Sequence, residues 1–263
     1  MSERRRGRRK QLDVSHQRNW LTGRHVVFEV LEAGVWPCTR LCVTPAVSAE
    51  LADIMHRHDS HGSSSVQQVT AERLTELCGS RHHQGIAAQM AIIPYCSLQG
   101  FHRLLEKREE SGQLPPLVVI CDRIQDGHNL GAILRSCDAM AVDAVIIGEN
   151  GQIGVTPQVA RASAGAVNHV PVVRSDPLLD AVSMLKDAGF QLLAASEKST
   201  TFAWEVDAST ATALVIGSEA HGVHDVLLSK CDQQVAIRML GRMGSLNAAV
   251  AAGIMLYELR RRR

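Results

Sequence analysis

The second half of the chain alternates between short apolar runs and longer segments with helical periodicity. The apolar runs occupy residues 117–121, 144–148, 168–173, 190–196, 212–218 and 233–239. Runs that are apolar at nearly every position predict strands buried on both faces, and helices between such strands predict a parallel sheet. We therefore expect an α/β domain over residues 117–263, with its ligands at the carboxyl ends of the strands.

The first half has a mixed pattern that predicts a smaller α/β unit. Helices are expected at residues 25–34, 48–58 and 71–79, and strands at residues 39–44, 66–70 and 85–93. Two of the helices should end at Gly34 and Gly79, since glycine readily adopts the left-handed conformation of a helix C-terminus. This unit is predicted to span residues 21–97. A helix and linker follow at residues 98–116, because a charged stretch there ends in Gly112 and two prolines.

The bulk composition is that of an ordinary globular protein. Of the 263 residues, 45% are hydrophobic and 21% are charged, while aromatic residues make up only 3%. The low aromatic content argues against RNA binding by base stacking on a broad aromatic surface. No apolar run is long enough to cross a bilayer, and the cationic N-terminus lacks the apolar segment of a secretory signal. We expect a cytoplasmic protein without membrane contact.

The seven cysteines do not form a metal or disulfide pattern. They include no C-x-x-C pair, and Cys38 and Cys42 have no second pair of ligands at the spacing of a zinc site. We expect reduced thiols in a cytosolic protein and no bound metal.

The net charge of +1 hides a strong asymmetry along the chain. Residues 4–10 and 260–263 place ten cationic side chains at the two ends, so the body between them is net acidic. Residues 1–20 are predicted to form a disordered basic arm. One interpretation is that such runs are solvated tails, and the other is that they are attracted to a polyanion by counterion release.

Three polar clusters follow strands of the second half, at residues 123–139, 215–223 and 237–253. Each has a plain structural interpretation, since Asp126, Asn129 and Ser245 are types that cap helices, and the glycines are common turn residues. Their joint occurrence at three strand ends of one sheet favours a functional site. A phosphate loop is excluded, because the required Lys-Ser/Thr does not follow the "GSEAHG" segment.

The clusters carry a family resemblance. The segments "DRIQDGHNLGAILRSCDA", "SAGAVNHVPV", "LVIGSEAHGV" and "IRMLGRMGSLNAAVAAGIMLYE" resemble, in order, the motifs of the SpoU (TrmH-like) RNA ribose 2′-O-methyltransferases of the SPOUT superfamily. The likeness covers residues 117–260. The first half is similar to the L30e-like substrate-binding domain of the RlmB-type enzymes, through "HVVFEVLEAG", "TRLCVT" and "HHQGIAAQM".

The resemblance implies a fold, a cofactor and partners. The second half is expected to contain a trefoil knot whose loops bind S-adenosyl-L-methionine, and the enzyme is expected to act on RNA as a homodimer. The implied cofactor-binding residues are Gly217, Ile237, Met239 and Leu246. Glycine suits a close approach of the backbone to a ligand, because it has no Cβ.

The functional polar residues implied by the resemblance are Asn129, Arg135, Glu219, Ser245 and Asn247. The family often credits the arginine as general base. A guanidinium stays charged, however, and its planar fork suits a phosphate. We therefore interpret Arg135 as the residue that binds the target phosphate. The base role stays open, with Glu219 a second candidate or an orienter of Arg135. The three remaining side chains would position ribose and cofactor by hydrogen bonds.

The preferred function is methylation of a guanosine in large-subunit (23S) rRNA. A tRNA ribose methyltransferase is the main rival, and about ninety residues before the linker favour rRNA, because tRNA enzymes of the family often lack such a domain. A non-catalytic RNA-binding or ribosome-assembly factor is disfavoured by the complete set of polar residues. A small-molecule enzyme on the same kind of sheet is disfavoured by the cationic ends.

Overall fold

The computed structural model describes residues 19–57, 65–109 and 114–261, and these form two compact units. Unit 1 comprises the chain up to Pro94 together with Val155–Asn168. Unit 2 comprises Tyr95–Gly154 and the chain from His169 onward. The cationic run at residues 4–10 lies outside the described residues. No helix in the described ranges is long and apolar enough to span a membrane.

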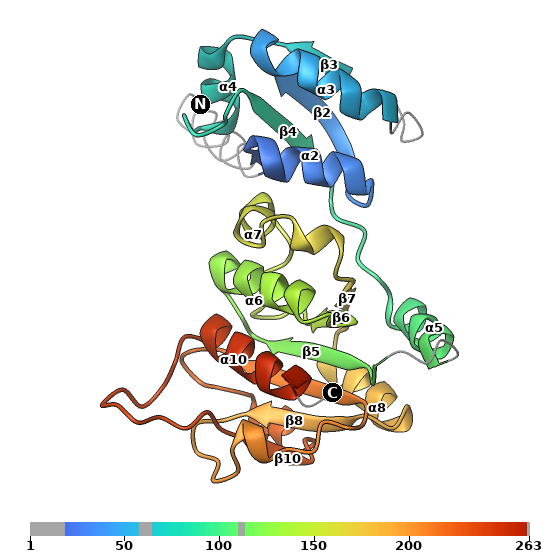
Figure 1. The fold of residues 1–263 in the computed structure, drawn as a ribbon, viewed down its shortest axis with the longest axis vertical. Coiled ribbons are helices and arrows are strands. Elements are labelled where there is room, and N and C mark those ends of the chain that lie inside the picture. Colours follow the sequence, from blue (N-terminus) through green and yellow to red (C-terminus); the bar gives the residue numbers. More distant parts are fainter. Residues whose placement is uncertain (1–18, 58–64, 110–113, 262–263) are drawn as a thin grey trace, which may run out of the picture. The chain divides into compact units, whose positions relative to one another are not determined.

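Unit 1 is built on a mixed sheet in the order β1-β4-β2-β3 (Figure 1). Its strands are β1 (Trp20–Thr22), β2 (Cys38–Val43), β3 (Ser65–Gln68) and β4 (Ile86–Met90). Its helices are α2 (Arg24–Ala33), α3 (Pro45–Arg57), α4 (Ala71–Cys78), α7 (Pro157–Ala162) and the 3-10 helix η1 (Ala166–Asn168). The predicted helix ends are confirmed, since Gly34 and Gly79 both have left-handed backbone conformations after their helices.

The predicted disordered arm at residues 1–20 is wrong at its last residue. Trp20 begins β1, is only 4% exposed and lies opposite Gln89 of β4. The strand is three residues long, which is too short for its alternation to be recognised in the sequence. Residues 1–18 are not among those described.

Unit 2 is built on a parallel sheet in the order β10-β8-β9-β5-β6-β7, as the sequence pattern predicted. The strands are β5 (Leu117–Asp122), β6 (Ala144–Ile147), β7 (Val172–Arg174), β8 (Gln191–Ala195), β9 (Thr212–Gly217) and β10 (Gln233–Val235). The helices are α5 (Leu98–Glu109), α6 (Gly127–Ala139), α8 (Leu178–Asp187), α9 (Asp225–Leu228) and α10 (Ala248–Arg261), with the 3-10 helix η2 (Ala203–Glu205).

Helices cover both faces of this sheet. Helices α5, α8 and α9 share one buried apolar cluster with β5, β6, β8 and β9, while α6 and α10 pack against each other (Figure 1). Phe101 and Leu105 of α5 lie in that cluster, so the helix that the sequence placed beside a linker is part of the core of unit 2. The trefoil knot and the domain limits at residues 21–97, 98–116 and 117–263 stay predictions.

Three predicted strands are much shorter than expected. The run 85–93 forms β4 only over Ile86–Met90. The run 168–173 contributes only its last residues to β7, because Asn168 closes a turn on Gly165 and Pro171 has no N–H to donate. The run 233–239 forms β10 only as far as Val235. The next residue, Ala236, donates instead to the carbonyl oxygen of Thr201 at 2.8 Å.

The cysteines of the described chain are free thiols, as predicted. Cys42, Cys121 and Cys137 are fully buried, and the others are half-buried. Burial raises the pKa of the Cys121 thiol to about 12, with a smaller contribution from Asp122. This thiol is therefore uncharged at neutral pH and packs in the core as a small apolar side chain.

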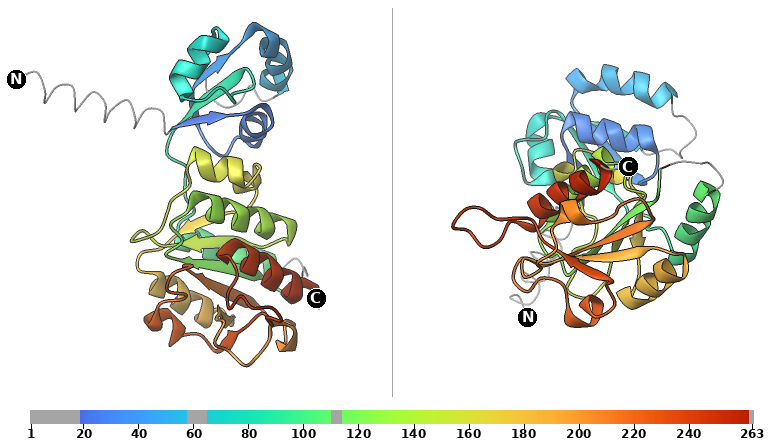
Figure 2. Two further views of the ribbon diagram at one scale, coloured as in Figure 1. Left: turned by 90° about the vertical axis from the view of Figure 1, so that its left-hand side faces the viewer. Right: turned by 60° about the horizontal axis from the view of Figure 1, so that its bottom comes forward.

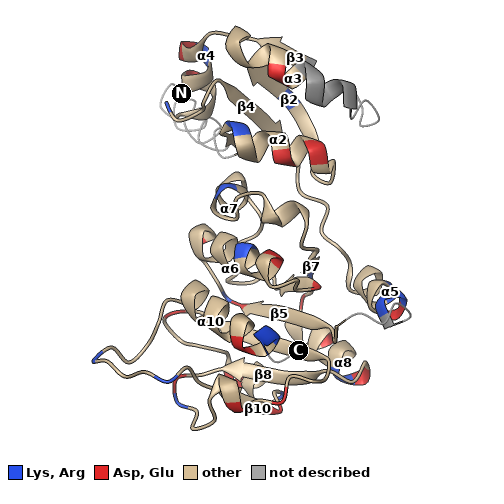
Figure 3. Cartoon of the chain, in the orientation of Figure 1, with Lys and Arg blue, Asp and Glu red and all other residues tan. Residues whose placement is uncertain are grey.

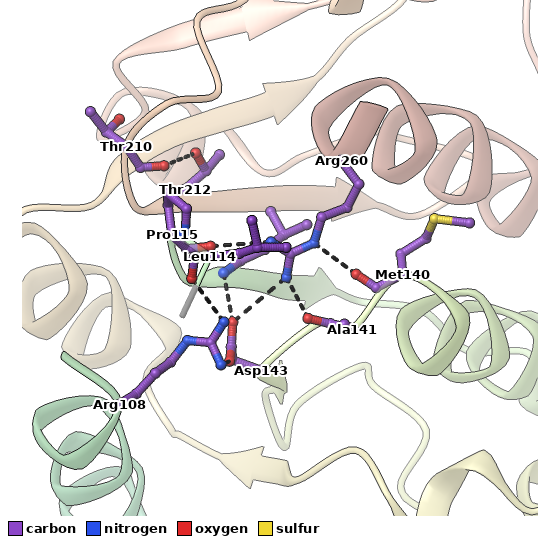
Figure 4. A network of polar contacts seen from close by, with 10 residues as sticks. Arg108, Leu114, Pro115, Met140, Ala141, Asp143, Thr210, Thr212 and Arg260 are labelled. Atoms are coloured by element: carbon purple, nitrogen blue, oxygen red, sulfur yellow. Dashed lines mark hydrogen bonds and ion pairs between the residues drawn. The ribbon is translucent and has the colours of Figure 1, made fainter. Parts of the chain in front are cut away.

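One C-terminal arginine is part of the fold. Arg260 lies 9% exposed and donates to the carbonyl oxygens of Met140 at 2.7 Å, Pro115 at 3.1 Å and Ala141 (Figure 4). These contacts join α10 to the end of α6 and to the start of β5. The interpretation of residues 260–263 as a solvated tail or polyanion arm is therefore wrong for Arg260.

The carboxylate of Asp143 completes this network (Figure 4). It pairs with Arg108 at 2.7 Å and accepts the backbone N–H of Leu117 at 2.8 Å, while Arg260 approaches it to 3.9 Å. Burial lowers the pKa of the Arg260 guanidinium, and the Asp143 carboxylate opposes that shift. The cluster is a buried charge network whose members depend on each other.

Replacing Arg260 is expected to destabilise unit 2. Arg260→Met removes the guanidinium that donates to three carbonyl oxygens, while the Asp143 carboxylate keeps Arg108 and the N–H of Leu117. We expect this loss to cost about 3 kcal/mol of unfolding free energy. The neighbour Arg261 has a side chain that is 48% exposed and pairs with Glu258, so Arg261→Met should cost far less unfolding free energy than Arg260→Met. Urea denaturation measures both values, and equal losses would contradict the assigned role of Arg260.

Candidate active site

A cavity of about 390 Å³ lies at the carboxyl ends of β8 and β9 in unit 2. All four residues predicted to bind the cofactor line it, namely Gly217, Ile237, Met239 and Leu246. Glu219 and Ser245 line it as well. The cavity therefore lies where ligands of parallel α/β sheets are expected, at the carboxyl ends of the strands (the strand-end rule). Strand β9 leads directly into the turn that carries Glu219.

Gly217 is required by the backbone that surrounds it. A Cβ at this position would overlap the main-chain atoms of Gly222 and Val223. The chain folds back on itself there, since the N–H of Gly222 donates to the carbonyl of Ser218 at 2.8 Å. The glycine thus permits the tight turn 218–222, which forms one wall of the cavity.

Two adjacent residues, Asp122 and Arg123, stabilise the turn 218–222 and the residues after it by hydrogen bonds. The Asp122 carboxylate is 4% exposed and accepts the N–H of His224 at 2.7 Å. Arg123 binds both Asp122 oxygens at 3.1 Å and donates to the carbonyl of Gly222 at 3.1 Å. Arg123 does this from a left-handed backbone conformation, with φ 59°, which is unfavourable for a residue with a side chain.

A chain of side-chain hydrogen bonds connects three of the predicted polar residues. Asn247 donates from Nδ2 to Oδ1 of Asn129 at 2.9 Å, and Asn129 donates from Nδ2 to Oε1 of Glu219. The three residues come from the start of α10, from α6 and from the turn after β9. Residues 118 positions apart in sequence are therefore brought into direct contact.

The capping of α10 by Asn247 determines which group of each side chain donates and which accepts in this hydrogen-bond chain. Oδ1 of Asn247 accepts the N–H groups of Ala249 at 3.0 Å and Val250 at 3.3 Å, so it caps α10. Only its NH₂ group is left for Asn129, whose own NH₂ group must then face Glu219. The hydrogen-bond chain therefore runs from Asn247 through Asn129 and ends at a carboxylate oxygen of Glu219, which accepts.

The capping roles differ partly from those expected. Asp126 caps α6, accepting the N–H of His128 at 2.9 Å, which confirms its plain structural interpretation. Asn129 is not the cap. Ser245 is not the cap of the last helix either, because α10 begins at Ala248 and Asn247 takes that position.

The two roles of Asn247 can be separated by mutation. Asn247→Ala removes the cap and the donor to Asn129, and should lower the unfolding free energy by about 1 kcal/mol. Asn247→Asp keeps an oxygen that caps α10, so its stability should stay within about 0.5 kcal/mol of wild type. Both variants lose the donor and should lose about tenfold in methyl transfer. Full activity in Asn247→Asp would exclude a role for the hydrogen-bond chain.

Arg135 is brought neither into the cavity nor into the hydrogen-bond chain. It is exposed on α6, and within the described ranges it makes no hydrogen bond or ion pair. It follows Asn129 by six residues, which places it about 120° around the helix axis from Asn129. A ligand that reaches Arg135 must therefore extend beyond the cavity.

Several lining residues were missed in the sequence. Ser196, Glu197 and Lys198 follow β8 and line the cavity beside Glu219. The strand-end rule applied to the run 190–196 would have found them. Asp122 and Arg123 were overlooked because a buried ion pair between adjacent residues has no distinct sequence pattern. Among the described residues, no group of three or more His, Cys, Asp or Glu side chains is arranged to hold a metal ion.

Comparison with known proteins matches both halves of the chain. The profile of the SpoU rRNA Methylase family matches residues 116–257, and that of the RNA 2′-O ribose methyltransferase substrate binding family matches residues 20–96. A TrmH family tRNA/rRNA methyltransferase of Staphylococcus aureus (strain COL), so named, is 36% identical over 92% of this chain and 96% of its own length.

Solved structures with the same fold include two of interest here. The SpoU methyltransferase AviRb from Streptomyces viridochromogenes, in complex with the cofactor AdoMet, is 25% identical with a TM-score of 0.74, covering 92% of this chain and 89% of its own. The TrmH/SpoU tRNA modifying enzyme of A. aeolicus is 31% identical with a TM-score of 0.52, covering 61% of this chain and 84% of its own. With both profiles and a full-length relative in agreement, the chain belongs to the SpoU (TrmH-like) methylase family.

Proposed function

We propose that this protein transfers a methyl group from S-adenosylmethionine to a ribose 2′-hydroxyl of RNA, with a guanosine of large-subunit rRNA as its target. The observation that carries the proposal is the cavity lined by Gly217, Ile237, Met239 and Leu246, with Glu219 at its edge and bonded to Asn129. Its volume of about 390 Å³ lies in the range of small-molecule sites.

The lining suits S-adenosylmethionine. Ile237, Met239 and Leu246 offer apolar surface to an adenine ring, and the close turn at Gly217 leaves backbone groups near the ligand. Glu197, Lys198 and Glu219 offer charged groups to a molecule that carries a carboxylate, an ammonium and a sulfonium. When bound, the cofactor supplies a methyl group already activated on sulfur, so the reaction needs no metal.

The polar residues have separable roles in this proposal. A ribose hydroxyl is a weak nucleophile until its proton is removed, and Glu219 is our candidate acceptor, because only its Oε1 is engaged by Asn129. Arg135 binds the adjoining phosphate, which its planar fork fits. Asn129 holds the carboxylate and is itself held by Asn247, and Ser245 in the cavity lining orients ribose or cofactor. Orientation of the reacting atoms supplies most of the rate gain.

Large-subunit rRNA is preferred over tRNA as substrate. The supporting features are the substrate-binding profile over residues 20–96 and the rRNA description of the family that matches unit 2. The A. aeolicus tRNA enzyme corresponds to only 61% of this chain. Against this, the S. aureus relative is named for both tRNA and rRNA, so a tRNA enzyme is the second candidate.

A homodimer is part of the proposal. Val250, Ile254 and Tyr257 of α10 are spaced along one face of the helix and are 50%, 38% and 54% exposed. The loop that joins β10 to α10 extends from the body of unit 2 (Figures 1 and 2), and its Leu240 and Met243 are 86% and 73% exposed. A second copy that covers these residues could also bring its Arg135 to the cavity.

The test is methyl transfer from labelled S-adenosylmethionine to undermodified rRNA and to bulk tRNA, with the product mapped by blocked alkaline cleavage. Label at one site of large-subunit rRNA is the expected result. Label only in tRNA would keep the chemistry and overturn the substrate. Absence of cofactor binding would overturn the enzyme function and favour an RNA-binding or assembly factor.

A further inference from the structure

The loop between α4 and β4 in unit 1, residues 79–85, makes hydrogen bonds within itself and to its neighbouring helices. His83 is 7% exposed, and its Nδ1 accepts the N–H of Gly85 at 3.0 Å. Its other ring nitrogen must then carry the proton, and it lies 3.2 Å from the hydroxyl oxygen of Thr75. Gln84 accepts the N–H of Arg24 at 2.8 Å. The loop is thus tied to both neighbouring helices, α4 and α2.

The backbone of the loop is also strained. Gln84 has φ 53°, in the left-handed region that residues with side chains avoid, and Gly85 follows with φ 79°. A Cβ on Gly85 would lie 2.6 Å from the hydroxyl oxygen of Thr44. Such strain persists only where surrounding contacts impose it, and it concentrates at functional positions.

This loop exposes Arg81 and His82. Both side chains are exposed, and neither makes a side-chain hydrogen bond or ion pair within the residues that the structure describes. The backbone N–H of His82 donates to the hydroxyl oxygen of Ser80 at 3.1 Å. The loop therefore exposes an arginine and a histidine at adjacent positions of the chain.

The other arginines of unit 1 with described side chains have partners within the unit. Arg24 pairs with Glu50 at 3.3 Å, and Arg73 pairs with Glu76 at 2.8 Å. The remaining contacts are those of Arg40 with the side-chain oxygen of Gln67 at 2.6 Å and of Arg161 with the carbonyl of Trp20 at 3.5 Å. Among the arginines of unit 1 whose side chains the structure describes, Arg81 is thus the one left for an external anion.

We propose that Arg81 and His82 form the contact of unit 1 with the substrate RNA, an inference that rests on RNA being the substrate. Arg81 binds a backbone phosphate, which its planar fork fits. His82 stacks on a base of the adjoining unpaired nucleotide, as imidazole rings do in single-stranded RNA recognition. A phosphate flanked by an unstacked base, as in an rRNA loop, matches this pair of neighbouring side chains.

The test is a titration of the full-length protein with a labelled fragment of large-subunit rRNA at several salt concentrations. Arg81→Ala should weaken binding about tenfold and lower the slope of log affinity against log salt by about one, because one phosphate contact is lost. His82→Ala should weaken binding about fivefold with an unchanged slope, since stacking releases no counterion.

Arg73→Ala is the matched control. It removes the same charge from α4 of the same unit, but its guanidinium is already paired with Glu76. The affinity for RNA should therefore stay within about twofold of wild type, and the slope of log affinity against log salt should be unchanged. Thermal unfolding and S-adenosylmethionine binding, which report on folding, should be unchanged in all three variants.

Each outcome decides the proposal. Wild-type affinity and slope in Arg81→Ala would overturn it while leaving the methyltransferase function intact. Equal losses of RNA affinity in Arg81→Ala and Arg73→Ala would also overturn it, because the loss would then follow from the total positive charge and not from a phosphate contact of Arg81. A wild type that binds neither rRNA nor tRNA would overturn the proposed function and this inference with it.

Discussion

Gly217→Ala is expected to lower the affinity for S-adenosylmethionine more than 100-fold and to abolish methyl transfer. The added Cβ would overlap the main-chain atoms of Gly222 and Val223, which cannot move aside as a flexible side chain would. The turn 218–222 is also held by Arg123, which donates to the carbonyl of Gly222. The strain must therefore displace the wall of the cavity that carries Glu219.

Gly241→Ala is the matched control for this prediction. Gly241 lies in the loop before α10, and a Cβ there would meet no atom within 4 Å. Its binding of the cofactor, measured by calorimetry, should stay within about threefold of wild type, since no contact is created. If Gly217→Ala binds the cofactor as wild type does, the turn adapts and the close packing is not required for the site.

Arg135→Ala is expected to reduce methyl transfer about 100- to 1,000-fold while cofactor binding and stability stay at wild-type values. The side chain is exposed and contributes no internal contact in the described structure, so its removal leaves the fold unchanged. The loss follows from the missing charged donor at the phosphate, in the range seen when one transition-state donor is removed. Arg135→Lys should recover part of the rate, because it keeps the charge without the fork.

Arg103→Ala provides the comparison for Arg135→Ala. Arg103 is likewise an exposed arginine on a helix of unit 2, without a described partner, and its loss should leave single-turnover rates within about twofold. Loss of cofactor binding in Arg135→Ala would assign this residue to the cofactor site. A rate within threefold of wild type would remove it from the reaction.

Unit 2 exposes cationic side chains outside the cavity, and in the proposed function these would contact the RNA. Figure 3 shows cationic segments along the loop between β10 and α10, where Arg238 and Arg242 are exposed. Arg135 is exposed on α6 of the same unit. Phosphates contribute most of the affinity in such complexes, so these residues are expected to set binding strength rather than the target nucleotide.

Much of the candidate site could be predicted because its residues follow strands. The apolar runs 117–121 and 212–218 predict parallel strands, and the carboxyl ends of parallel strands share one edge of a sheet. Asn129 and Glu219 follow those two strands, and they are in contact in the structure. The strand-end rule places these two residues at the same edge of the sheet, and the family resemblance is what singled them out among the polar residues there.

The sequence by itself determined the alternation of strands and helices in unit 2, the helices that end at Gly34 and Gly79, and the polar residues after the strands, but not β1 or the short lengths of β7 and β10. Only the tertiary structure decided which of two neighbouring residues of the same type is buried and which is exposed. Arg260 and Arg261 are neighbours in one basic run, yet Arg260 is buried in the network of Asp143 and Arg261 is exposed. Successive helical residues point about 100° apart, so the packing of α10 against distant parts of the chain selects one of them.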